Sequence, residues 1–200
     1  KSAPSMVSLQ VGMLLEARGP NTSVNSLCAS GTDTIGTALN YIRLGYADVM
    51  IAGGSDASLD PMSVAALSRL GALTPEPDPD KASRPFDLNR NGFVYGEGAG
   101  MLILETYEHA KRRGAPILAE VAGAAWTYDA YNITAPHPDA EAIAMRTALQ
   151  NAGVKPEEVD YINAHGTSTK LNDTSETKAI KMAFGDSAYR IPISSIKSMF

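Results

Sequence analysis

The sequence VNSLCASG, residues 24–31, leads from a short predicted strand into a predicted helix and decides the fold. The first strand is expected over Ser23 to Leu27 and the next over Asp48 to Ala52. Between them Gly45 is the expected end of a helix. Apolar residues recur there at helical spacing: Ile35, Ala38, Leu39 and Ile42. A strand, a helix and a strand within about thirty residues predict a βαβ unit.

The same alternation continues along the chain, so the predicted class is α/β, with a parallel or mixed sheet covered by helices. Helices are expected over Asp139 to Asn151, ending at Gly153, and over Asp173 to Phe184, ending at Gly185. In the second, Asp173 is the expected N-cap and Glu176 the reciprocal residue of a capping box. Four further strands are expected: Ala99 to Glu105, Ile117 to Gly123, Val159 to Ala164 and Ile191 to Ile196.

Two interruptions divide this pattern. Residues 74–92 are rich in Pro, Asp and Asn without a period, which predicts a long loop of the kind that is often functional. The composition changes near Gly114, where a helix is expected to end and a strand to begin. We therefore expect one sub-region over residues 1–115 and a second over residues 116–200.

Composition excludes several classes of protein. The net charge of -5 and the lack of a dense Lys/Arg run argue against nucleic-acid binding, and no apolar run approaches the roughly 20 residues of a membrane span. One cysteine cannot form an internal disulfide, so the cytoplasm or an organelle matrix is the expected location. One cysteine and three widely spaced histidines give no metal-ligand spacing, and none is expected. The chain opens without Met, so we expect a piece of a longer protein.

Cys28 is the candidate nucleophile. Its expected place at a strand-to-helix turn gives it the unpaired N–H groups and positive dipole end of a helix, which stabilise a thiolate and can donate to an oxyanion. A lone cysteine is more commonly a small buried apolar residue, and position alone favours that alternative.

A series of motifs in one order resembles the β-ketoacyl-acyl-carrier-protein synthases of the elongating type, within the thiolase superfamily. The matching segments cover essentially the whole chain: CASG at 28–31, ADVMIAGG at 47–54, SRPFD at 83–87, GFVYGEGAG at 92–100, NAHGTST at 163–169 and SSIKSM at 194–199. The resemblance implies a thiolase-like fold, layered α-β-α-β-α and present here in part. On this basis residues 1–115 are the end of its N-terminal half and residues 116–200 the start of its C-terminal half.

The resemblance also assigns roles. His165 matches the histidine that donates to the malonyl thioester carbonyl during decarboxylation, and Lys197 the lysine that orders the site. Glu176 matches a buried carboxylate that offsets the lysine's charge. Thr167 and Thr169 match the threonines that hold the phosphopantetheine arm. The plain alternatives are a buried core histidine, a surface lysine and turn-forming threonines.

The implied reaction is a decarboxylating Claisen condensation of a Cys28-bound acyl group with malonyl-acyl-carrier protein, as in fatty-acid elongation. No cofactor beyond the carrier's phosphopantetheine is expected; the expected partners are acyl carrier protein and a second copy, as a homodimer. A type II polyketide ketosynthase, a non-catalytic thiolase-fold scaffold and a Cys28/His165 hydrolase are the alternatives. The family's second histidine and its Gly-Phe-Gly-Gly gate are absent from these residues, so this piece alone is not expected to catalyse condensation.

Overall fold

The computed structural model describes residues 5–132 and 135–200. The chain forms two compact units, each built from two separate stretches. Unit 1 comprises Lys1–Ala57 and Glu97–Val121, and unit 2 comprises Ser58–Gly96 and Ala122–Phe200. The residues expected to take part in chemistry are divided between them, with Cys28 in unit 1 and His165 in unit 2.

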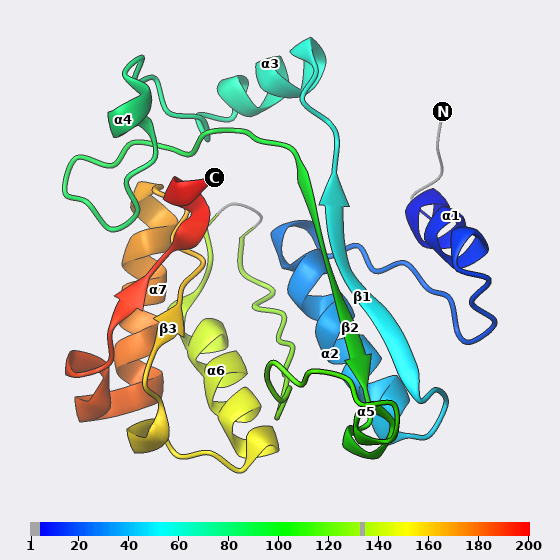
Figure 1. Cartoon of the computed structure of the whole chain (residues 1–200). Coiled ribbons are helices and arrows are strands. Elements are labelled where there is room, and N and C mark those ends of the chain that lie inside the picture. The colour runs from blue at the N-terminus through cyan, green and yellow to red at the C-terminus, as the bar shows by residue number, and fades with distance from the viewer. Residues whose placement is uncertain (1–4, 133–134) are drawn as a thin grey trace. The chain divides into compact units, whose positions relative to one another are not determined.

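Unit 1 is a two-stranded ribbon with helices beside it (Figure 1). Strands β1 (Val49–Asp56) and β2 (Gly98–Glu105) run antiparallel, with Val49 opposite Glu105 at one end and Asp56 opposite Gly98 at the other. The helical elements are α1 (Met6–Leu14), the 3-10 turn η1 (Leu27–Ala29), α2 (Ser30–Arg43) and α5 (Tyr107–Arg112).

The core of unit 1 lies where α2 packs on the ribbon. Ala38 of α2, Ala52 of β1 and Leu104 of β2 are buried against one another. Ile35 and Ile42 of α2 pack against this cluster. The apolar residues at helical spacing therefore lie on the buried face of the helix, as the sequence predicts. The helix ends as expected, with Gly45 at a φ of 75° just after it.

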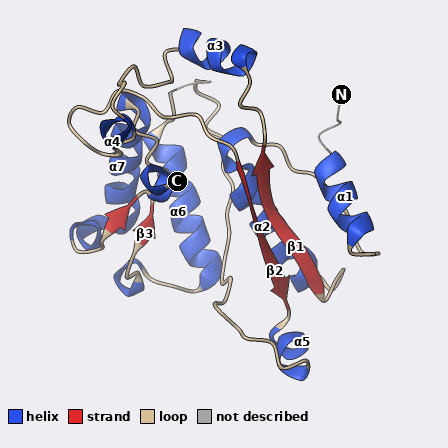
Figure 2. Ribbon diagram, turned by 45° about the horizontal axis from the view of Figure 1, so that its top comes forward, coloured by secondary structure: helices blue, strands red, loops and turns tan. Residues whose placement is uncertain are grey.

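The regular secondary structure of unit 2 is mainly helical, with long loops between the helices (Figure 2). Its α-helices are α3 (Pro61–Arg69), α4 (Pro79–Ala82), α6 (Pro138–Ala152) and α7 (Lys170–Phe184). Two short strands, β3 (Ile162–Asn163) and β4 (Ile193–Ser194), pair in parallel. Three 3-10 turns complete it: η2 (Pro156–Glu158), η3 (Gly185–Tyr189) and η4 (Ile196–Met199).

The core of unit 2 forms between α6 and α7. Ala142 of α6 and Ala179 of α7 are fully buried, and Ile180, Phe184 and Ile191 lie in the same cluster. The alanines let the two helices approach closely, and the larger apolar side chains pack in the same cluster.

Several details of the predicted secondary structure are wrong, among them the βαβ unit, whose first strand is absent. Ser23 to Leu27 and Ile117 to Gly123 are not strands, because no neighbouring strand among the described residues pairs with their backbone. The helix expected from Asp173 begins at Lys170, with Thr169 as its N-cap, because the Thr169 hydroxyl accepts from Asn172 N–H. Within the part of the chain described, no helix is long and apolar enough to cross a membrane.

Candidate active site

Cys28 lies in η1, immediately before α2, and its side chain is exposed. The Ser30 hydroxyl fixes this turn, since it accepts from Ser26 N–H at 2.9 Å and donates to the Leu27 carbonyl at 2.7 Å. Leu27 has a φ of 56°, a left-handed conformation that costs a bulky residue free energy. The predicted place of Cys28 at the start of a helix is confirmed; the strand before it is absent.

The first turn of α2 is held against β1 by a close approach of backbone. Thr34 Oγ1 lies 2.8 Å from both the Gly31 and the Gly53 carbonyl oxygens. A Cβ on Gly53 would lie 2.0 Å from the Gly100 carbonyl oxygen, and one on Gly54 would lie 3.3 Å from Gly31 Cα. Gly54 therefore lets the helix that begins beside Cys28 lie directly on β1, and Gly53 lets β1 and β2 approach closely.

His165 follows β3, as predicted, at the end of a parallel pair. Ala164 N–H donates to the Ser194 carbonyl at 2.8 Å and continues the pairing beyond the strand. At the same edge the Ser195 hydroxyl donates to the His165 carbonyl at 3.2 Å, and Lys197 Nζ donates to the same oxygen at 2.7 Å. The parallel register thus brings the His165 and Lys197 motifs together, although 32 residues separate them in sequence.

Glu176 holds the backbone of this histidine. Its carboxylate, only 6% exposed, accepts from His165 N–H at 2.6 Å and from Gly166 N–H at 2.8 Å. Asn172 Nδ2 donates to the same group at 3.3 Å. Among the described residues, the Glu176 carboxylate binds these three groups and not Lys197. The Lys197 ammonium instead donates to the His165 carbonyl. The capping-box role is therefore wrong, because Glu176 lies two turns inside α7 and its side chain reaches the histidine loop.

Thr167 and Thr169 form a pair of hydroxyls beyond His165, with 2.9 Å between their Oγ1 atoms. Both residues are half-buried. Thr169 also caps α7. Between them Ser168 has a φ of 66° and is fully buried, so the loop alternates accessible and buried residues. This geometry presents two adjacent hydroxyls that can donate to or accept from an amide-bearing chain.

The electrostatics of the site favour a neutral imidazole. Burial lowers the pKa of His165 below its ordinary value of 6.5, and the nearby Lys197 ammonium lowers it further. Glu176 and Asp173 act in the opposite direction with smaller effect. A neutral ring retains one N–H donor and can stabilise a developing enolate without first losing a proton.

A second carboxyl group behind the site has an unusual environment. Burial, and next the charge of Glu176, raise the pKa of Glu141 to about 7, and Asp129 adds a smaller increase. A hydrogen bond from Ser175 acts in the lowering direction. The Oε2 atom of Glu141 is buried without a hydrogen-bond partner among the described residues. Sequence reasoning gave Glu141 no role, since a glutamate in the first turn of a helix is ordinary.

Unit 2 therefore brings together five of the six residues predicted for the site: His165, Thr167, Thr169, Glu176 and Lys197. Cys28 belongs to unit 1. Two further residues contact this region and were not predicted as part of the site: Arg90, which binds the Thr169 and Lys170 carbonyls, and Asp173, which binds Arg90 and was expected only as a helix cap. The spacing of Asp173 and Glu176, three residues apart on one face of a helix, was the signal available for Asp173.

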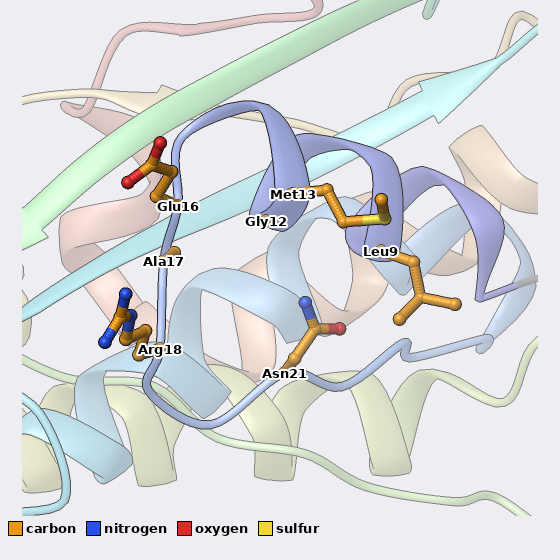
Figure 3. A pocket seen from close by; sticks show the side chains of 7 residues that line it. All are labelled: Leu9, Gly12, Met13, Glu16, Ala17, Arg18 and Asn21. Carbon is orange, nitrogen blue, oxygen red and sulfur yellow. The ribbon is translucent and has the colours of Figure 1, made fainter.

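Two other features of the described residues do not belong to this site. Within residues 5–132 and 135–200, no group of three or more His, Cys, Asp or Glu side chains could hold a metal ion. An open surface hollow of about 610 Å³ lies between α1 and the segment that follows it in unit 1 (Figure 3). None of the predicted site residues lines it; the lining residues are Leu9, Gly12, Met13, Glu16, Ala17, Arg18 and Asn21.

Comparison with known proteins places the chain in one family. The N-terminal domain of the beta-ketoacyl synthases matches residues 1–110, and the C-terminal domain of the same family matches residues 118–200. Nodulation protein E of Rhizobium meliloti is 51% identical over 198 residues, which are 99% of this chain and 48% of that protein. The 3-oxoacyl-[acyl-carrier-protein] synthase 2 of Staphylococcus aureus is 47% identical over 98% of this chain and 49% of that protein.

Solved structures of related proteins are similar to this chain as well. One chain from the structure of a type II polyketide synthase acyl-carrier protein in complex with its ketosynthase bound to the hexaketide aligns with a TM-score of 0.94 and 45% identity, over 98% of this chain and 49% of that one. A beta-ketoacyl synthase from Burkholderia phymatum aligns with a TM-score of 0.90 and 39% identity, over 97% of this chain and 47% of that one.

These matches confirm the predicted α/β, thiolase-like fold in its partial form. The chain spans about half the length of the curated relatives it matches. Both domain matches, the sequence identity and the order of the motifs lead to the same conclusion, and the chain belongs to the beta-ketoacyl synthase family.

Proposed function

We propose that the protein containing this chain catalyses the decarboxylating Claisen condensation of fatty-acid elongation. An acyl group passes from the phosphopantetheine thiol of an acyl carrier protein to Cys28 Sγ, so one thioester breaks as another forms. Malonyl-carrier protein then loses carbon dioxide. The resulting carbanion attacks the Cys28 thioester, releases the thiolate and gives 3-oxoacyl-carrier protein.

The arrangement around His165 is the observation that best supports this proposal. A neutral imidazole, held at its backbone by Glu176 and Lys197, is followed by the hydroxyl pair of Thr167 and Thr169. The histidine stabilises the enolate that decarboxylation creates. The hydroxyls bind the amide groups of the carrier's phosphopantetheine arm, and no further cofactor is required in this scheme.

Separate assays of the two half-reactions in the intact protein test the roles. His165→Ala should leave acyl transfer to Cys28 in place and slow malonyl decarboxylation by about 10² to 10⁴, the usual contribution of a positioned acid or base. Cys28→Ser should abolish acylation. His109→Gln is the matched control, since His109, in α5, pairs through Nδ1 with Glu105 of β2 and does not bind any residue of this site. Equal loss of both half-reactions in His165→Ala would assign the histidine a structural role only.

A type II polyketide ketosynthase is the second candidate, because one solved relative of this chain is a ketosynthase bound to its polyketide carrier protein. Both candidates use the same chemistry at Cys28 and His165, so the half-reactions do not separate them. Product analysis does: reductase-coupled elongation yields a saturated acyl-carrier protein, whereas a polyketide enzyme accumulates poly-β-keto chains.

We further propose a homodimer that pairs through β1. The backbone edge of β1 that faces away from β2 pairs with no strand among the described residues. The Val49 and Ile51 side chains of β1 are also exposed. An unpaired strand edge associates readily, and a two-fold dimer satisfies both copies at once. Sedimentation of the intact protein at low micromolar concentration should give a dimer, with an interface beyond about 2,000 Å². A stable, active monomer would rule this out.

A further inference from the structure

The long loop over residues 74–92 has no role in the proposed chemistry, yet it is bound tightly to the loop that contains His165. Three of its backbone N–H groups donate into the segment from Ser168 to Asp173. Arg84 N–H donates to Ser168 Oγ at 3.1 Å, Phe86 N–H to Asp173 Oδ2 at 2.8 Å, and Gly92 N–H to the Ser168 carbonyl at 2.9 Å. Both loops belong to unit 2.

The backbone at this junction is strained. Phe86 has a φ of 64° and Ser168 a φ of 66°, and neither is glycine. Residues other than glycine remain in this region only where their surroundings enforce it, at a cost of about 1 to 3 kcal/mol each. Something at the junction must therefore hold both turns in place.

Arg90 is positioned to do so. Its guanidinium donates to the Thr169 carbonyl at 3.0 Å, to the Lys170 carbonyl at 3.0 Å and to Thr174 Oγ1 at 2.9 Å. It also donates back to its own loop, at the Asp87 carbonyl, at 2.9 Å. One side chain thus joins the loop to the first turn of α7, in the forked geometry that arginine provides and lysine does not.

The same guanidinium balances a buried charge. Arg90 Nε lies 3.3 Å from Asp173 Oδ2, and these side chains are 15% and 1% exposed. A buried carboxylate that loses its cation is left uncompensated and destabilises the structure around it. Because Asp173 also holds Phe86, Arg90 supports the strained loop both directly and through the aspartate.

We propose that Arg90 is a positioning residue for the carrier-arm site: by fixing the Thr169 and Lys170 carbonyls and the Asp173 carboxylate, it sets the orientation of the Thr167 and Thr169 hydroxyls. The role of those hydroxyls rests on the proposed function. The positioning of the loop does not, because it follows from the contacts alone.

Hydrogen exchange in the intact protein tests the positioning without reference to activity. In Arg90→Gln the amides of Arg84, Phe86 and Gly92 should exchange at least about 10-fold faster. Asp173, which accepts from Phe86, loses its cation, and Ser168, which accepts from the other two, loses the bond that fixes the next residue, Thr169. Arg146→Gln is the matched control, because Arg146 also donates to a carbonyl of α7, at Met182, but at the far end of the helix. It should leave those three amides unchanged.

Kinetics test the carrier-arm role. Arg90→Gln should raise the KM for carrier-bound substrates about 10-fold in both half-reactions, the equivalent of one lost hydrogen bond, with kcat changed less than about 3-fold. Arg90→Lys, which keeps the charge beside Asp173, should fall between the parent and Arg90→Gln and provides a folded variant if the glutamine protein unfolds. A residue that merely supports the fold would lower the fraction of active sites and leave KM unchanged.

Unchanged exchange at the three amides, or a KM no higher than that of Arg146→Gln, would overturn the proposal. If the parent protein itself performs neither half-reaction, the proposed function fails, and the hydrogen-exchange comparison still decides whether Arg90 positions the loop.

Discussion

Lys197 Nζ donates to the backbone carbonyl of His165 at 2.7 Å, so its charge lies beside the histidine without binding the ring. Glu176 accepts the N–H of the same residue from the other side. The histidine is thus fixed at its backbone by two charged groups of opposite sign, and burial and the net field determine its protonation. Neither of these two contacts uses a ring nitrogen, so both leave the imidazole available to a substrate.

The first prediction concerns the pKa of His165. Because the Lys197 ammonium is one cause of its lowered pKa, Lys197→Met should raise that pKa toward 6.5. Glu176 acts in the opposite direction, so Glu176→Gln should lower it. NMR titration of the imidazole measures both changes. Lys178→Met, which removes an exposed lysine on α7, is the control and should leave the pKa unchanged. A Lys197→Met protein with an unaltered His165 titration would contradict the assignment.

The second prediction concerns the carboxylate of Glu176. In Glu176→Gln the side chain retains one acceptor oxygen and turns an NH₂ group toward the His165 or Gly166 N–H donor. A buried donor without an acceptor costs about 1 to 3 kcal/mol. We expect a loss of this size in the free energy of unfolding, measured by urea denaturation. Glu157→Gln, at an exposed position in η2, is the control. Equal stability of the two variants would mean that the Glu176 bonds contribute nothing.

The sequence predicted the positions of these residues better than their bonds. Apolar spacing correctly located α2 and α6, because the apolar stripe of an amphipathic helix can be recognised within one continuous segment of sequence. The Ser23–Leu27 and Ile117–Gly123 strands could not be judged in the same way, because a strand requires a partner that is distant in the sequence. The two domain halves, divided near residue 115, remain a prediction.

The misjudged residues show the same limit. Asp173 looked like a helix cap because a local motif fitted it, but its carboxylate is buried and binds Arg90 and Phe86, both more than 80 residues away. Arg90 lies in a segment predicted only as a loop. Its contacts to α7 follow from tertiary structure, and no period or short motif encodes them. The catalytic roles of Cys28, His165 and Lys197 still rest on resemblance and remain to be measured.

The third prediction concerns the pH dependence of stability. The pKa of Glu141 is about 7 in the folded protein and near 4.5 when unfolded, so the folded state binds more protons between these values. Stability from this group is complete below about pH 4.5 and is lost as the pH rises through 7. Glu141→Gln should therefore gain stability over the parent at pH 8 but not at pH 4. Partial exposure reduces the difference to the order of 1 kcal/mol.

Thermal melting of both proteins at the two pH values measures this difference. The charged groups that face Glu141 are Glu176 on α7 and Asp129 in the preceding loop, and both disfavour its ionisation. Asp129→Asn should reproduce part of the effect. Parallel pH dependence in the parent and Glu141→Gln would show that Glu141 titrates normally.

The last prediction concerns Gly53, which lies close to β2 and whose carbonyl accepts a hydrogen bond from Thr34 in the helix after Cys28. Gly53→Ala would place a methyl group 2.0 Å from the Gly100 carbonyl oxygen and 2.9 Å from Met101 Cα, both backbone atoms that cannot move without displacing β2. Overpacking of this kind typically costs 1 to 3 kcal/mol, or about 2 to 4 °C in Tm for each kcal/mol in a domain of this size. Because Thr34 ties α2 to the Gly53 carbonyl, the rate of alkylation of Cys28 should change as well. Gly19→Ala meets no atom within 4 Å and is the matched control, with Tm and alkylation rate close to the parent. If Gly53→Ala behaves like Gly19→Ala in both measurements, the close approach of α2, β1 and β2 does not position the nucleophile.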